Sequence, residues 1–342
     1  MNDSNLTGAD IAKLAGVSSA TVSRIINGQI GKRSKVKDRV LKVIEETDFQ
    51  INPGAPKSVS PESSFIGLIF PNSVSSILSE HYYTKIIESV TFACNQRDYN
   101  LVLFLSQSVA DQEKIFAKIN RPGMLAGLIA NVGCFNGACL IPLVKEARIP
   151  VVLAGRNAEL DSFSYVDIDN VRAAINAVQH LISLGRKRIA TITGPMNVTD
   201  GCDRLKGYRQ ALMARGFPVD EDLIIEGDYS EKTGYYSARR LIPKNIDAIF
   251  CANDEMAIGV MRAIQEAGLS VPKDIAVIGF DDIAASSQTN PPLTTIRQPL
   301  RTFGSKLVDL LVNKIEGAAK PAMKIVLDTE LVIRQSCGET FW

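Results

Sequence analysis

Short apolar runs alternate with longer amphipathic segments along most of this chain. Eight runs after residue 64 are candidate β-strands: 66–70, 101–105, 127–130, 151–154, 189–193, 224–226, 248–251 and 275–279. Between them lie segments with helical periodicity, of which the clearest are 82–96, 171–184, 204–215, 233–241 and 255–267. Buried strands that alternate with helices form doubly wound parallel sheets. Strands in this number predict an α/β core of two such subdomains, with a ligand cleft between them at the carboxyl ends of the strands.

Three shorter amphipathic segments precede this core. Thr7 and Asp10 form a capping pair that predicts the start of a first helix, and Gly16 supplies a turn after it. Ser18 is placed to cap a second helix. The positions expected to face inward are Ile11, Ala12, Leu14 and Ala15 in the first helix, Ala20, Val22, Ile25 and Ile26 in the second, and Val40, Leu41, Val43 and Ile44 in a third over 36–47. Three short helices with a tight turn after the first predict a helix-turn-helix head.

Positive charge is concentrated in this head. Residues 1–59 contain nine Lys and Arg against six Asp and Glu, whereas the rest of the chain contains 29 against 31, so the overall charge of +1 hides an asymmetry. A basic run alone is more often a solvated helix face, but a basic helix-turn-helix indicates a partner that carries phosphates. A three-helix bundle that docks on another protein would explain neither the charge nor the polar helix face. We therefore expect the head to bind double-stranded DNA.

In a helix-turn-helix, the start of the second helix enters the major groove. The residues expected to contact DNA are Thr7, Ser18, Ser19, Ala20, Thr21, Ser23, Arg24, Asn27, Lys35 and Lys37. Ser19 and Ala20 are small, so we expect modest direct readout of bases from them. Arg24 is therefore expected to carry much of the recognition.

The composition argues against several other classes of protein. No stretch reaches the ~18 apolar residues that a membrane span needs. The first thirty residues lack the basic start and apolar run of a secretory signal, so we expect a cytoplasmic location. Two histidines, and six cysteines without a CxxC pair, predict no metal site. No P-loop, GxGxxG after a strand or GxSxG elbow is present, so we expect neither an enzyme nor a cofactor.

The head segment DIAKLAGVSSATVSRIING resembles the signature of the LacI/GalR family of ligand-responsive transcription regulators. Later segments resemble the same family in the same order: VDIDN, HLISLGRKRIATITGP, DRLKGYRQAL, IFCANDEMAIG, VPKDIAVIGFDD and PPLTTIRQP. The resemblance implies a core like that of periplasmic binding proteins. It also implies a regulator, most commonly a repressor, that binds a palindromic operator as a homodimer and is switched by a small effector in the cleft.

This resemblance sets the expected domain boundaries. The head is expected over 1–50 and a linker over 51–64. The chain is expected to cross between subdomains near Val166–Asp169, near Pro292 and near Ile325. The predicted first subdomain is therefore 65–165 with 292–322, and the predicted second subdomain is 166–291 with 323–338.

The linker departs from the family pattern. Members of the family place a hinge helix here and wedge a leucine into the minor groove. In this chain Pro53, Gly54, Pro56 and Pro61 disfavour a helix, and Ser58 stands where the leucine is expected. We therefore predict a flexible or extended linker and weaker kinking of DNA.

The resemblance also suggests where an effector binds. The residues expected to contact it are Asn72, Ser73, Tyr83, Arg204, Tyr229, Asn253 and Asp281. Arg204 and Asp281 offer a donor fork and a carboxylate to adjacent hydroxyls, and Tyr229 offers a plate for a sugar face. A polar residue after a strand often only caps the next helix, which is the role we expect for Asp254.

Two classes of function fit such a core. The first is a transcription regulator switched by a sugar or a nucleoside. The second is a periplasmic-type sugar-binding transport protein, which would have no use for the basic head. Because only QSCGETFW follows Arg334, we expect a dimer without the additional helix that makes some family members tetramers.

Overall fold

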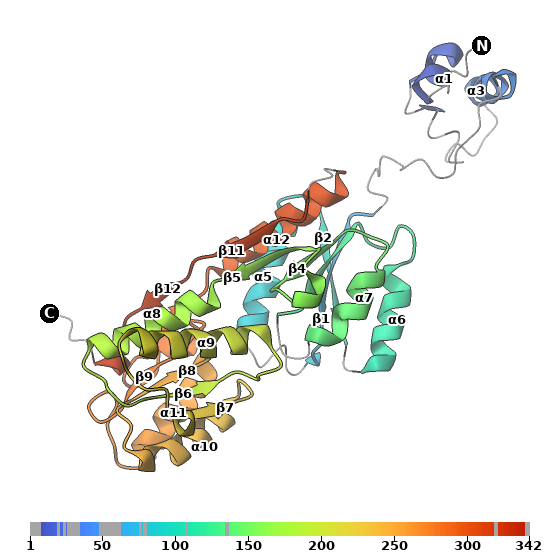
Figure 1. The fold of residues 1–342 in the computed structure, drawn as a ribbon. Coiled ribbons are helices and arrows are strands. Elements are labelled where there is room, and N and C mark those ends of the chain that lie inside the picture. The colour runs from blue at the N-terminus through green and yellow to red at the C-terminus, as the bar shows by residue number, and fades with distance from the viewer. Residues whose placement is uncertain are drawn as a thin grey trace. The chain divides into compact units, whose positions relative to one another are not determined.

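The chain forms two compact units, Met1–Ser58 and Val59–Trp342, which we call the head and the body (Figure 1). The computed structural model describes residues 8–18, 21–22, 25, 35–47, 63–74, 77, 81–106, 108–133, 137–317 and 321–338. The predicted linker lies almost wholly outside the described residues.

Helices α1 (Gly8–Ala15) and α3 (Lys35–Glu46) frame the head. Residues 21, 22 and 25 between them are helical as well. The buried side chains of the head form one cluster: Ile11, Ala12, Ala15, Val22, Ile25 and Val40. The apolar periodicity therefore produced the expected small core.

The turn after α1 agrees with its sequence. Gly16 has a φ of 64°, where a side chain would be strained. Ser18 caps the next helical segment, because its Oγ accepts a hydrogen bond from the backbone N–H of Thr21 at 3.3 Å. Leu14 and Leu41, however, were wrongly predicted to face inward, since they are 59% and 45% exposed. The core of so small a unit is filled by one narrow stripe per helix, and both leucines lie at its margin.

The first subdomain of the body contains a six-stranded parallel sheet in the order β11-β5-β4-β3-β1-β2. Its strands are β1 (Phe65–Phe70), β2 (Asn100–Leu105), β3 (Gly127–Asn131), β4 (Val151–Ala154), β5 (Ser164–Ile168) and β11 (Lys324–Leu327). Helices α5 (His81–Asn95) and α12 (Leu300–Ile315) cover one face (Figure 1). Helices α6 (Val109–Ile119) and α7 (Ile141–Glu146) cover the other. This is the doubly wound arrangement that alternating strands and helices predict.

The second subdomain repeats the design with a four-stranded parallel sheet in the order β7-β6-β8-β9. Its strands are β6 (Ile189–Thr193), β7 (Ile224–Glu226), β8 (Ala248–Cys251) and β9 (Ala276–Ile278). Helices α8 (Asn170–Ser183) and α9 (Thr199–Ala214) pack on one face, and α10 (Glu231–Leu241) and α11 (Asp254–Glu266) on the other. Among the described residues, short 3₁₀ turns join the elements of both subdomains: 137–140, 158–160, 221–223, 242–244, 284–287 and 335–337.

Three segments of chain connect the subdomains. The first follows β5, the second contains β10 (Thr295–Arg297), and the third contains β12 (Glu330–Val332). Strands β10 and β12 pair antiparallel as a two-stranded sheet of their own. This pair brings together two chain segments that are distant in sequence.

The strand pairing corrects the predicted boundaries. Residues 166–168 and 323–327 were assigned to the second subdomain, but β5 and β11 belong to the first sheet, where β11 pairs with β5 and β5 with β4. An apolar run shows that a strand is buried, but not which of two sheets it joins. The crossings therefore lie after Ile168 and after Leu327.

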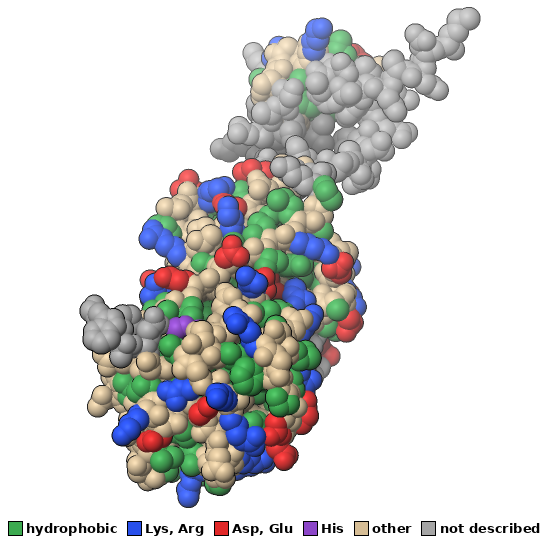
Figure 2. All heavy atoms as spheres, turned by 60° about the vertical axis from the view of Figure 1, so that its left-hand side comes forward, with side chains coloured by type: hydrophobic (Ala, Val, Ile, Leu, Met, Phe, Trp, Pro, Cys, Tyr) green, Lys and Arg blue, Asp and Glu red, His purple; other side chains and the backbone are tan. Residues whose placement is uncertain are grey.

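The surface of the body fits its near-neutral composition. On the face shown in Figure 2, basic and acidic side chains are interspersed. Among the described residues, no helix combines the length and the apolar character needed to cross a membrane.

Ser336 joins the 3₁₀ turn 335–337 to the second subdomain by hydrogen bonds. Its fully buried hydroxyl donates to the carbonyl of Val277 at 2.6 Å and accepts from the backbone N–H of Thr294 at 2.8 Å. Replacing Ser336 with Ala leaves two buried backbone groups unpaired, so we expect a loss of about 2 kcal/mol in the free energy of unfolding. Denaturant titration of the variant measures this loss. The exposed Ser287→Ala is the matched control, and equal losses in the two variants would contradict the role of the Ser336 bonds.

Candidate functional site

Polar side chains from both subdomains meet where the parallel strands of the two sheets end. Asn72 follows β1 in the first subdomain, and Asn253 and Asp281 follow β8 and β9 in the second. Parallel α/β sheets bind ligands at this edge. The junction between the subdomains is therefore the candidate site.

Arg204 occupies the centre of this junction. It lies on α9 and is only 5% exposed. Its Nε donates to Oδ1 of Asn170 at 2.8 Å, and its Nη1 donates to the carbonyl of Ala252 at 2.6 Å. The guanidinium carbon lies 3.7 Å above the centre of the Phe280 ring. A planar cation held by two hydrogen bonds and an aromatic face is fixed in orientation before any ligand arrives.

Close packing of α9 on α8 sets the position of this arginine. A Cβ at Gly207 would collide with the backbone carbonyl of Val171 on α8, so the two helices approach closely because Gly207 has none. Gly201, nearer the start of α9, allows a close approach to the loop after β6, because a Cβ there would lie 2.6 Å from the carbonyl oxygen of Pro195. The sequence therefore permits α9 to reach the junction.

Asp281 follows β9 in a backbone conformation that is rare for a residue with a side chain. Its φ is 111°, and that of Asp282 is 53°. Oδ1 of Asp281 accepts a hydrogen bond from Nε2 of Gln298 at 2.6 Å. Burial raises the pKa of Asp281 to about 6, although Arg204 and the Gln298 bond both act in the opposite direction. Residues held at positive φ cluster at functional sites, and this pair follows that rule.

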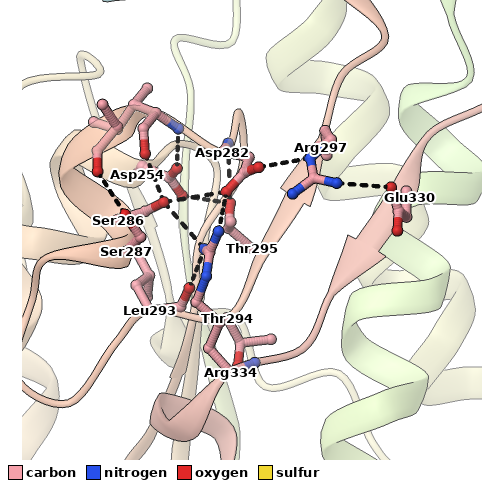
Figure 3. A network of polar contacts seen from close by, with 12 residues as sticks. Asp254, Asp282, Ser286, Ser287, Leu293, Thr294, Thr295, Arg297, Glu330 and Arg334 are labelled. Carbon is pink, nitrogen blue, oxygen red and sulfur yellow. Dashed lines mark hydrogen bonds and ion pairs between the residues drawn. The ribbon is translucent and has the colours of Figure 1, made fainter.

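A polar network holds the loop that carries Asp281 (Figure 3). Asp282 accepts from Nε of Arg297 at 2.7 Å and from Nη2 of Arg334 at 2.6 Å. Arg297 lies on β10, and Arg334 follows β12. The loop beside Asp281 is therefore fastened to two of the three segments that connect the subdomains.

Asp254 supports the same loop from the core. Its carboxylate is fully buried and accepts hydrogen bonds from the Thr295 hydroxyl and from the backbone N–H of Ile283. Burial, with Asp281 close by, raises its pKa well above the ordinary value. The expected capping role was wrong for this residue. Asn253 caps α11 instead, because the helix begins one residue earlier than predicted and its Oδ1 accepts from the N–H of Met256.

Asn253 also positions Tyr229. Its Nδ2 donates to the backbone carbonyl of Tyr229 at 2.8 Å, and Tyr229 is held at a φ of 69°. The half-buried ring of Tyr229 lies directly against Gly194, where any Cβ would collide with the phenol. Both polar ends of the Asn253 side chain are thus engaged within the protein, and its main contribution is to place Tyr229.

The first subdomain contributes a pair of tyrosines from α5. Tyr83 is only 3% exposed and stacks edge-on against Phe70 and Tyr82. Nδ2 of Asn72, beside Ser73, lies 3.5 Å from the Tyr83 hydroxyl. Tyr82 lies near Arg204 of the second subdomain, whereas Tyr83 is buried against Phe70.

The sequence analysis missed a cluster of charges that bridges the two subdomains. Arg156 follows β4 of the first subdomain and forms an ion pair with Asp203 on α9 of the second. Its Nε also lies 3.2 Å from Oδ2 of Asp167, which accepts no hydrogen bond from the described residues. Asp200 lies beside this cluster, one helical turn before Arg204. Asp200 and Arg204 are four residues apart, which places both on one face of a helix. This spacing was the sequence signal that could have pointed to the cluster.

Burial dominates the carboxyl groups of this cluster. It raises the pKa of Asp167 to about 8 and that of Asp200 to about 6. The neighbouring Asp200 adds to the shift of Asp167, and Arg156 counteracts it. For Asp200, the charge of Arg204 is the main opposing influence.

The structure describes only part of the predicted DNA-contacting surface. Ser18 is exposed, and its hydroxyl lies 2.9 Å from that of Thr21. Lys35 begins α3, and Lys37 lies on the same helix. The remaining predicted contacts fall outside the described residues: Thr7, Ser19, Ala20, Ser23, Arg24 and Asn27.

Comparison with known proteins identifies the class of protein that this fold and site define. Residues 8–52 match the model of bacterial regulatory proteins of the lacI family, and residues 178–337 match a periplasmic binding protein-like domain. The HTH-type transcriptional regulator CelR of Thermobifida fusca is 33% identical over 95% of this chain and 96% of its own. Catabolite control protein A of Priestia megaterium is 31% identical over 97% and 99%.

Solved structures agree. A CelR–cellobiose complex covers 97% of this chain and 99% of its own with a TM-score of 0.76 and 32% identity. A lac repressor dimer bound to its operator and an anti-inducer covers 98% and 99%, with a TM-score of 0.69 and 28% identity. The chain belongs to the lacI family of DNA-binding transcription regulators. It is a regulator and not an enzyme, with the head and the two parallel-sheet subdomains that the sequence predicted.

The raised pKa values predict that the body loses stability as the pH rises. Folded Asp167, Asp200 and Asp281 hold protons that the unfolded chain releases at an ordinary carboxyl pKa near about 4. Their contribution to stability is complete below that value and is lost as the pH rises through the folded-state pKa values. Calorimetric unfolding between about pH 5 and about pH 8.5 should therefore show a falling Tm.

Asp167→Asn should flatten this slope most, because Asp167 has the highest pKa of the three. The exposed Asp222→Asn should leave it unchanged. A Tm that is the same across the range in the unaltered protein would contradict the raised pKa values.

Proposed function

We propose that this chain is a repressor that binds a palindromic operator as a homodimer and is switched by a sugar held between the subdomains of the body. The observation that carries the proposal is the arrangement of Arg204 and Asp281. A guanidinium and a carboxylate, each already fixed by protein contacts, offer a donor and an acceptor to adjacent hydroxyl groups. The solved CelR–cellobiose complex supports a sugar as the effector class.

Tyr229 and Tyr82 complete the proposed pocket. Both are half-buried aromatic residues near Arg204, one from each subdomain. An aromatic ring beside polar donors suits a molecule with one apolar face and several hydroxyl groups. Asn72 and Ser73, at the end of β1, are the proposed contacts from the first subdomain.

The connecting segments offer a route from the ligand to the heads. A ligand that contacts both subdomains favours the relative orientation in which both sets of contacts form. The Asp282 bonds to Arg297 and Arg334 link the loop that carries Asp281 to two connecting segments. A displacement of Asp281 is therefore transmitted to these segments. The effector then shifts DNA affinity by its differential affinity for the two orientations.

Dimerisation follows from the proposed operator. A two-fold symmetric protein presents two heads to the two halves of a palindrome. The lac repressor, a structural relative, was solved as a dimer on its operator. We place this activity in the cytoplasm, where DNA is accessible.

The first experiment is a thermal-shift screen of the full chain against sugars, sugar derivatives and nucleosides. A ligand at ~100 times its dissociation constant stabilises the folded state by ~2.7 kcal/mol, which such a screen detects. The compound that stabilises the protein is then added to a titration of operator DNA selected from a random library. A compound that binds the body without altering DNA affinity would refute the proposed switch.

Replacing Arg204 with Ala should abolish the response to the effector and leave DNA binding intact. The substitution removes the donor fork from the proposed pocket and touches no part of the head. Titration of labelled operator with and without effector measures both properties. Arg209→Ala is the control, because Arg209 lies on the same helix but is only half-buried and is paired with Glu221. An Arg204→Ala protein that responds normally would rule out this pocket.

Replacing Arg24 with Ala should weaken operator binding by about 1–3 kcal/mol, the range for a residue that reads a base. The sequence places Arg24 on the predicted second helix of the head. Effector binding, measured by calorimetry, should not change. Lys42→Ala is the control, since Lys42 is exposed on α3 and pairs with Glu46 of the same helix. Equal effects of the two substitutions would show that Arg24 contributes only general charge.

A further inference from the structure

Negative charge exceeds positive charge at the junction of the subdomains. Four carboxyl groups interact electrostatically there with two guanidinium groups, Arg156 and Arg204. The carboxyl groups belong to Asp167, Asp200, Asp203 and Asp281. A ligand that enters the proposed pocket therefore meets a site with a net negative charge when these acids are ionised.

Both guanidinium groups already interact with carboxyl groups of the protein. Arg156 is shared between Asp167 and Asp203. The charge of Arg204 already opposes the raised pKa of both Asp200 and Asp281.

Asp200 is the acid best placed to meet a ligand. It lies one turn before Arg204 on α9 and is half-buried. Its Oδ1 lies 3.6 Å from the position that a Cβ would occupy at Gly133 of the first subdomain. The opposing surface there is glycine backbone, since Gly133 packs against Gly155, where a Cβ would lie 2.6 Å from the Cα of Gly133.

The hydrogen bonding of Asp200 leaves it free to accept from a ligand. Among the described residues its one hydrogen bond is a long one, 3.5 Å from Nδ2 of Asn170 to Oδ1. Asp281 likewise has one hydrogen bond from the described residues, to Oδ1 from Gln298. Two half-buried carboxylates with spare acceptor capacity flank Arg204. Hydroxyl or amine hydrogens satisfy such acceptors, whereas phosphate and carboxylate oxygens do not.

We infer that the effector is an uncharged or amine-bearing polyol and that Asp200 is the specificity-determining residue that excludes phosphorylated and carboxylated analogues. The inference rests on the proposed function, because it concerns the same pocket. A unit negative charge at about 6 Å from Asp200 is repelled strongly enough at intermediate dielectric to weaken binding by about 100-fold.

Matched pairs of ligands test the inference. Glucose, cellobiose, ribose and adenosine are each compared by calorimetry with a charged counterpart: glucose 6-phosphate, cellobionate, ribose 5-phosphate and adenosine monophosphate. On the scaffold that binds, the neutral member should bind about 100-fold more tightly than the anionic one. An anionic member that binds as tightly as its neutral partner overturns the inference but leaves the proposed function standing. Binding on no scaffold overturns the proposed function, and the inference with it.

The role of Asp200 has its own test. Asp200→Asn keeps the shape of the side chain and removes its charge, so the ratio of the two dissociation constants should fall at least about 10-fold. The ratio is the readout because general damage to the pocket would weaken both members of a pair alike. The exposed Asp222→Asn in the same subdomain should leave the ratio unchanged. An unaltered ratio in Asp200→Asn would overturn the assignment of specificity to this residue.

Discussion

The buried guanidinium of Arg204 is the interaction on which the organisation of the body depends. Among the described residues it is the one Lys or Arg whose side chain is buried. A buried cation requires full hydrogen bonding and neighbouring negative charge, and the surroundings supply both. Asn170 at the start of α8 and the carbonyl after β8 accept its hydrogen bonds, while Phe280 covers its face. Three separate segments of the second subdomain are thereby oriented around one side chain.

Buried or half-buried carboxylates beside the connecting segments are likewise held by hydrogen bonds and ion pairs. Asp282 is held by two arginines, and Asp254 is held by Thr295 and a backbone N–H. These bonds join the loop after β9 to β10 and to the segment after β12 (Figure 3). A site built on rigidly held charges, adjacent to the segments that link two subdomains, is suited to convert ligand contacts into a change of orientation. The geometry of the body thus fits the membership of this chain in a family of ligand-responsive regulators.

The acids at the junction are incompletely compensated by positive charge. Arg156 joins the subdomains through Asp203, while the buried Asp167 and the half-buried Asp200 lack full compensation. Such carboxyl groups lower the stability of the folded state at neutral pH, and functional sites are where proteins retain such groups. A ligand that donates hydrogen bonds to them relieves part of this cost. With the role that we infer for Asp200, stability and ligand selectivity are linked through the same side chain.

The sequence by itself determined the class of fold and the composition of its parts. The helical periodicity of apolar residues such as Ile11, Ala15 and Val40 predicted the core of the head. The alternation of apolar runs with helical segments predicted the parallel sheets. Family resemblance then singled out Arg204 and Asp281, which the structure places near each other. These features are local in sequence, because periodicity and motif spacing are properties of short segments.

Only the tertiary structure decided which distant segments meet. It assigned β5 and β11 to the first sheet. It showed that Asp254 is bonded within the core and that Asn253 caps α11, and it placed Tyr82 near Arg204. It also joined Arg156 to Asp203, two residues with no pattern between them in the sequence. Sheet membership and ion pairing depend on the packing of elements far apart along the chain. The periodicity of one segment contains no information about its partner.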